Sequence, residues 1–122
     1  MPFALSSDEL YAKSAYSSDT PADNTAAVQT ITPATGEIAV LDWFEYSYDG
    51  VPVESALVTV KIGSTTVFNH VLDATVDAAV GTQIIGPFVG AVDEVIVVTI
   101  PAAGANDKCT LNIKYRNNAV IT

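Results

Sequence analysis

The clearest β-strand in this sequence reads KCTLNIKYR and covers residues 108–116. Its apolar positions alternate with polar and charged ones, which is the period of a strand with one buried face and one solvent face. The apolar set consists of Cys109, Leu111, Ile113 and Tyr115. The pattern therefore predicts a half-buried strand whose outward face carries Lys108, Lys114 and Arg116.

The rest of the chain from Thr25 onward consists of short β-branched and aromatic runs separated by turn residues. Val, Ile and Thr make up 38 of the 122 residues, a composition that favours strands over helices. The expected strands are 25–32, 37–48, 53–62, 65–72, 82–89, 93–100 and 108–116, with a last short piece at 119–121. Short connections require antiparallel pairing, so the spacing indicates an antiparallel sandwich or barrel.

Two turn signals add detail to this arrangement. Gly63-Ser64 lies between two strand patterns and predicts a tight hairpin with Gly at its first position. Gly86-Pro87 falls inside the run at 82–89, where a residue without a side chain precedes one without an N–H. That pair predicts a bulge or an edge strand.

Two segments carry more apolar surface than a single core face needs. Residues 95–100 are apolar on both faces, which predicts a central strand whose outer face is covered by an arm, a loop or another subunit. In residues 37–48, alternation places Phe44, Tyr46 and Tyr48 on one side and Leu41 and Trp43 on the other. These aromatic residues are interpreted either as core and interface filler or as a platform for stacking on sugars.

Charge and cysteine content exclude several classes of protein. The chain has 14 acidic residues against five Lys and Arg, a formal net charge of -9. Because such a chain repels phosphate backbones and anionic headgroups, we expect no nucleic-acid and no membrane partner. Residues 108–122 hold three cations and no acid, so the C-terminal end is locally basic. Cys109 is the only cysteine, which excludes an intramolecular disulfide and a zinc finger.

Residues 1–24 are more polar than the rest, and we predict an N-terminal arm there, followed by a β-sandwich domain at 25–122. Ser6 and Glu9 have capping-box spacing, which predicts a short helix that runs through Lys13. We expect the apolar residues of the arm to lie on another surface; they include Phe3, Leu5, Leu10, Tyr11 and Tyr16. No secretory-signal pattern and no membrane-length apolar run is present, so we expect a soluble, cytoplasmically made protein.

Catalytic and metal-binding patterns are missing from the sequence. His70 is the only histidine, and without a nucleophile-elbow motif we expect it to be structural or at the surface. The acidic clusters at 19–24, 73–77 and 93–94 lack EF-hand spacing, although a calcium ion held between loops stays open. No phosphate-binding glycine loop, dinucleotide fingerprint or Cys-x-x-Cys occurs. We expect no enzyme, no cofactor and no resident metal.

Residues 39–61, with FEYSYDGVP at positions 44–52, resemble small all-β virion proteins of tailed bacteriophages. The likeness continues through 66–68, 86–88, 95–105 and 111–113 and covers about residues 25–116. It is carried by turns and β-branched runs, without a catalytic motif. The resemblance implies a jelly-roll or related sandwich that decorates or cements a capsid, usually as a trimer at symmetry axes.

Together these arguments predict an all-β, jelly-roll-like antiparallel two-sheet β-sandwich of seven or eight strands with an N-terminal arm. The resemblance implies a structural protein of the outer capsid surface, a homotrimer bound to the major capsid protein, in which linked subunits add avidity. The expected contact residues are Phe3, Leu5, Tyr11, Tyr16, Trp43, Lys108, Lys114 and Arg116. The alternative is a glycan- or receptor-binding module of a head fibre or tail, and a small glycoside-active enzyme would need two facing carboxylates.

Overall fold

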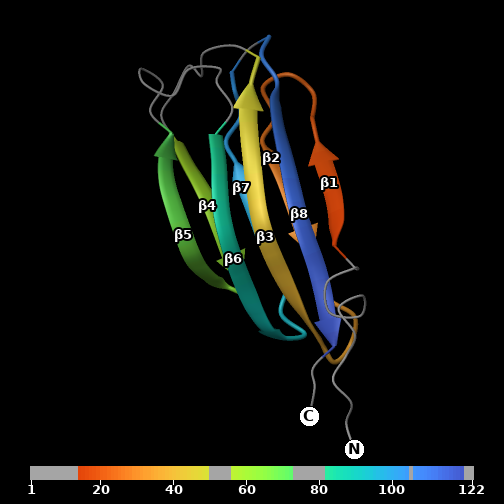
Figure 1. Ribbon diagram of the computed structural model, residues 1–122. Helices are drawn as coiled ribbons and strands as arrows, with labels where there is room; N and C mark the ends of the chain where they lie inside the picture. Colours follow the sequence, from red (N-terminus) through yellow and green to blue (C-terminus); the bar gives the residue numbers. More distant parts are fainter. Residues whose placement is uncertain (1–13, 50–55, 73–81, 105, 120–122) are drawn as a thin grey trace, which may run out of the picture.

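The computed structural model describes residues 14–49, 56–72, 82–104 and 106–119 (Figure 1). This part of the chain contains eight strands and no helix. The strands are β1 (Ala15–Asp19), β2 (Ala27–Ile31), β3 (Glu37–Tyr48), β4 (Ala56–Ile62), β5 (Thr65–Leu72), β6 (Thr82–Val92), β7 (Ile96–Ile100) and β8 (Cys109–Ala119). The predicted all-β class is confirmed.

The strands form two four-stranded antiparallel sheets that lie face to face (Figure 1). Sheet A has the order β1-β8-β3-β6, and sheet B has the order β2-β7-β4-β5. The pairing is nested: β4 pairs with β5, β3 with β6, β2 with β7 and β1 with β8. A long hairpin with these pairs, rolled so that alternate pairs enter opposite sheets, is the jelly-roll form of the β-sandwich.

The core lies between the two sheets and is filled by the alternating inward positions of the strands. Phe44 of β3 is fully buried and contacts Phe68 of β5 and Phe88 of β6, with ring centroids 6.1 and 6.4 Å apart. The other large, fully buried side chains are Ile31, Leu41, Ile96, Ile100, Leu111, Ile113, Val58, Val60 and Val98. Burial of this apolar area is the main stabilising contribution to the fold.

A bulge in β3 changes which positions face the core. Leu41 pairs with Tyr115 and Trp43 pairs with Lys114, so two steps along β3 match one step along β8 and Asp42 is the extra residue. Before the bulge Leu41 points inward, and after it the inward residue is Phe44. The prediction that Leu41 and Trp43 share a face is therefore wrong, because an extra residue reverses the alternation.

The predicted irregularity at Gly86-Pro87 is confirmed, and β6 is also one of the two edge strands of sheet A. Opposite Leu41 and Trp43, β6 moves from Phe88 to Ile85, so the Gly-Pro pair forms the bulge that matches Asp42. A Cβ atom on Gly86 would lie 2.7 Å from the Leu41 carbonyl oxygen. Only glycine fits this close approach of two backbones.

Most predicted strand bounds are confirmed within a few residues. The turn at Gly63-Ser64 joins β4 to β5, with φ of 59° at Gly63. The strand expected at 93–100 begins only at Ile96, because Asp93, with φ of 65°, belongs to the turn after β6. Of the expected piece at 119–121, Ala119 is the last residue of β8 and the others lie outside the described residues.

Strand β1 comes from the segment at residues 1–24 that the sequence analysis assigns to the N-terminal arm. Residues Ala15–Asp19 form β1 and pair with β8 at the edge of sheet A. Gln29 of β2 joins this edge to the other sheet, since its side chain accepts a hydrogen bond from Ser17 and donates one to the Leu111 carbonyl. Asp19 also accepts a hydrogen bond from the backbone N–H of Val28. These contacts close the sandwich along the β1 and β2 edges.

Candidate functional site

The outer face of sheet A carries one row of side chains that crosses all four strands. The cross-strand neighbours in this row are Tyr16, Lys114, Trp43 and Ile85. The Tyr16 and Trp43 ring centroids lie 6.1 Å apart with their planes at 56°, and Lys114 Nζ lies 5.8 Å from the Tyr16 ring centroid. The structure thus brings three of the predicted contact residues together.

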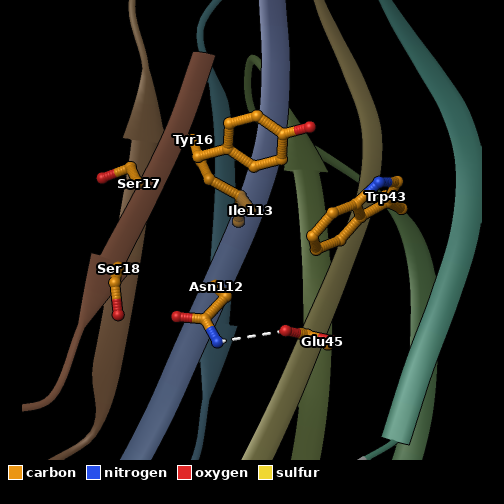
Figure 2. Close-up of a pocket in the computed structure, with 7 residues that line it drawn as sticks. All are labelled: Tyr16, Ser17, Ser18, Trp43, Glu45, Asn112 and Ile113. Atoms are coloured by element: carbon orange, nitrogen blue, oxygen red, sulfur yellow. Dashed lines mark hydrogen bonds between the residues drawn. The ribbon is translucent and has the colours of Figure 1, made fainter. Parts of the chain in front are cut away.

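An open hollow of about 240 Å³ lies beside this row. Figure 2 shows Tyr16 and Trp43 at one end of the hollow and Asn112 and Glu45 at the other. Asn112 Nδ2 donates a hydrogen bond of 3.2 Å to Glu45 Oε1. A second hollow of about 170 Å³, lined by Glu45, Tyr46, Ser47 and Asn112, shares this polar pair. Pairing across 67 residues of sequence creates the site, so alternation along one strand could not have identified Asn112 as the partner of Glu45.

The two other predicted cations lie apart from the hollow. Arg116 Nε is 3.3 Å from Asp42 Oδ1, and both side chains are largely buried. Lys108 precedes β8 and is exposed at the opposite end of that strand. Because β3 contributes Asp42 and Glu45 to the face that β8 supplies with cations, the face mixes both signs of charge.

The aromatic residues that the sequence offers as a sugar platform divide between the two faces of β3. Phe44, Tyr46 and Tyr48 are buried, at 0%, 2% and 4% exposure. Tyr48 donates its hydroxyl hydrogen to the Pro101 carbonyl oxygen at 2.8 Å. These three side chains fill the core and cannot form an exposed platform, while Trp43 stays on the outer face with Tyr16, a residue that is 70% exposed.

The outer face of sheet B carries exposed apolar side chains among Thr, Asn and Lys residues and lacks acidic residues. Its four strands contain one charged side chain, Lys61, and no Asp or Glu. Four apolar side chains on this face are 45–60% exposed, namely Val28, Leu57, Val67 and Val71. Strand β7 is central, as predicted, and its outward Val97 and Thr99 are half-buried between β2 and β4. The sequence pattern predicted an unusual outer face at β7 but not its extension across β4 and β5.

The described carboxylates mainly accept hydrogen bonds from backbone N–H groups at strand ends. Asp93 accepts one from Gly36 at 2.7 Å, and Asp49 accepts one from Lys108 at 2.7 Å. Among the residues that the structure describes, no group of three His, Cys, Asp or Glu side chains is arranged to hold a metal ion. The same described residues contain no helix that is long and apolar enough to cross a membrane.

His70 and Cys109 are both directed toward the interior. His70 lies on the half-buried inward side of β5, opposite Val58. Cys109 is 1% exposed, and its thiol donates a hydrogen bond to the Thr25 carbonyl oxygen. Burial raises the pKa of the Cys109 thiol above its ordinary value of 9.0. A protonated, buried thiol of this kind is a poor nucleophile.

Three of the predicted contact residues, Phe3, Leu5 and Tyr11, lie outside the described residues, as do the helix expected near Lys13 and the acids at 73 and 77. Comparison with known proteins gives no matching family model and no significant match to a curated protein.

Proposed function

We propose that this chain is a structural virion protein of a tailed bacteriophage, which decorates or cements the capsid as a homo-oligomer bound to the major capsid protein. The observation that carries the proposal is the outer face of sheet B, where Val28, Leu57, Val67 and Val71 are exposed and no acidic residue lies in the strands. The jelly-roll topology and the resemblance of residues 25–116 to small phage virion proteins support it. Fold alone does not define a function, so the face is the stronger argument.

A second copy of this chain is the occupant that the charge distribution favours for sheet B. Two molecules with a net charge of -9 repel each other wherever carboxylates meet. The strands of sheet B bring no carboxylate to such a contact, while Leu57 and Val71 bring exposed apolar area. Burying apolar area contributes roughly 25 cal/mol per Å², so copies of an acidic chain associate most favourably through this face.

We propose that the self-associated chain binds the major capsid protein through several subunits at once. Each subunit contributes a modest contact with the major capsid protein, and a linked trimer converts three such contacts into high avidity. The N-terminal arm with Phe3, Leu5 and Tyr11 is the proposed additional contact. Lys108 is exposed and available to orient the subunit on an acidic partner surface.

The decisive measurement is the mass in solution by light scattering, for the full chain and for two charge-insertion variants. The full chain should give a multiple of the 12.8 kDa subunit mass, three for a trimer. Leu57→Glu places a carboxylate on the outer face of sheet B and should give the subunit mass. Ile85→Glu is the matched control, because Ile85 is also exposed but lies on sheet A; it should leave the oligomer intact.

Binding to the capsid is measured by cosedimentation with shells of the major capsid protein encoded by the same phage genome. The full chain should sediment with the shells, and the monomeric Leu57→Glu variant should lose most of its occupancy. A truncation that removes residues 1–13 tests the arm without removing β1. A full chain that is monomeric and stays in the supernatant would contradict the proposal.

A further inference from the structure

We propose that the hollow on the outer face of sheet A is a binding site for a neutral saccharide. The site lies on the sheet opposite to the self-association face, so it adds a function to the proposed structural role. Its walls come from three strands: Tyr16 and Ser18 from β1, Trp43 and Glu45 from β3, and Asn112 from β8.

The two aromatic rings supply the apolar part of the site. Tyr16 is 70% exposed although it is a large aromatic residue, and it contacts Trp43 at a 56° angle between the ring planes. Each ring face carries negative electrostatic potential and attracts weakly positive C–H groups. One face of a pyranose ring consists of such C–H groups. The arrangement therefore suits a sugar ring that lies against one aromatic side chain and beside the other.

The polar end of the hollow supplies hydrogen-bonding groups for sugar hydroxyls. The bond from Asn112 Nδ2 to Glu45 Oε1 holds both side chains in place (Figure 2). Glu45 retains its second carboxylate oxygen as an acceptor, and Asn112 retains its amide oxygen and a second N–H. Neighbouring hydroxyls both donate and accept, so this fixed pair matches them. A few fixed polar groups beside apolar walls are typical of small-ligand sites.

The charges at the two ends are opposite, so an ionic ligand of either sign that spans the hollow is repelled at one end. The Lys114 ammonium already lies over Tyr16 and repels a cationic ligand from the aromatic end. The Glu45 carboxylate repels an anionic ligand from the polar end, as does the net charge of the chain. A neutral polyhydroxylated ligand encounters neither repulsion.

The size of the site fits sugar units rather than a larger ligand. Its volume of about 240 Å³ is below the roughly 300–1,000 Å³ of sites for drug-sized molecules. The second hollow meets it at Glu45 and Asn112 and continues past Ser47. A linear oligosaccharide can therefore place one ring against the aromatic residues and the next beyond the polar pair. Trisaccharides should accordingly bind more tightly than single sugars.

The test is chemical-shift mapping on the isotopically labelled full chain, with glucose, galactose and N-acetylglucosamine and their linear trimers as probes. At least one neutral trisaccharide should shift the NMR resonances of the Trp43 indole N–H and of the amides around Asn112. It should also bind more tightly than the corresponding single sugar. Sialyllactose and choline serve as the anionic and cationic comparisons and should bind more weakly than that trisaccharide.

Three variants assign the binding to this hollow. Tyr16→Ala should weaken binding of the trisaccharide about five- to tenfold, the ratio expected for one lost aromatic contact. Ile85→Ala is the matched control, because it truncates an exposed apolar side chain of the same row and does not line the hollow. The Leu57→Glu variant should bind the trisaccharide as well as the wild-type chain does, so the site is tested independently of self-association.

The proposal is overturned if no neutral sugar of the panel binds at about 10 mM. It is also overturned if Tyr16→Ala and Ile85→Ala bind alike, or if choline or sialyllactose is preferred. These outcomes leave the oligomer and its capsid binding untouched, so they refute the saccharide site alone.

Discussion

Substituting Gly86 by alanine should destabilise the fold through a single added methyl group. The new Cβ would lie 2.7 Å from both the Leu41 carbonyl oxygen and the Phe88 amide nitrogen, and 3.1 Å from the Asp42 carbonyl oxygen. All three neighbours are backbone atoms, so the matched bulges of β3 and β6 must move apart. Overpacking costs about 1–3 kcal/mol, and one weakened ladder hydrogen bond adds about 1 kcal/mol. We expect a total loss of about 2–4 kcal/mol.

Thermal unfolding by calorimetry or circular dichroism measures this loss. For 122 residues, an unfolding entropy of about 0.25 kcal/mol/K makes 2–4 kcal/mol equal to a fall of about 8–16 °C in Tm. Gly90→Ala is the matched control on the same strand, since its Cβ would meet its nearest neighbours at 3.5–3.7 Å. It should leave Tm unchanged or raise it slightly by reducing the entropy of the unfolded chain. A Gly86→Ala variant that melts with the wild type, or a Gly90→Ala variant that loses as much, would show that the close backbone contacts at Gly86 do not limit stability.

Two further predictions concern the core. Phe44→Ala should lower the free energy of unfolding by about 3–5 kcal/mol in urea titrations, against less than about 0.5 kcal/mol for Ile85→Ala, which truncates an exposed side chain outside the self-association face; equal losses would show that Phe44 is not the central packing residue. Because burial raises the pKa of Cys109, the folded chain keeps a proton that the unfolded thiol loses at high pH. The stability advantage of the wild type over Cys109→Ala should be constant up to about pH 8 and shrink as the pH rises above about 9, whereas an advantage that grows above pH 9 would reverse the inferred direction. In the folded state the thiol should also resist alkylation at neutral pH until denaturant is added.

Alternation and turn residues were sufficient to predict most of the strands. Strands β3 and β5 have the predicted bounds, because both runs are strongly β-branched or aromatic and end at turn residues. Strand β1 was not predicted, since its sequence AYSSD has little β propensity. It forms because β8 offers it an unpaired edge, and such tertiary pairing overrides local preference.

The candidate sites were predicted only in part. Tyr16, Trp43 and Lys114 were each expected to make contacts, and the sheet places them in one row. Their partner Asn112 was not predicted, because the register between β3 and β8 is set by long-range pairing and by the bulge at Asp42. The exposed apolar residues of sheet B were also missed, since Leu57 and Val71 each stand among polar outward residues of their strands and only the pairing of β4 with β5 brings them side by side.

The nested pairing has a consequence for how this chain is made. Ala15 of β1 pairs with Tyr115 of β8, which leaves the ribosome 100 residues later. During synthesis the hairpin of β4 and β5 is the first pair whose two members are both available, and β1 and β2 must wait for strands not yet translated. Folds dominated by such distant contacts form slowly, and waiting strands are prone to pair with other chains. A nascent chain crowded among its own copies is therefore at risk of exchanging its first strand with a neighbour, and slower translation after β5 should increase that exchange.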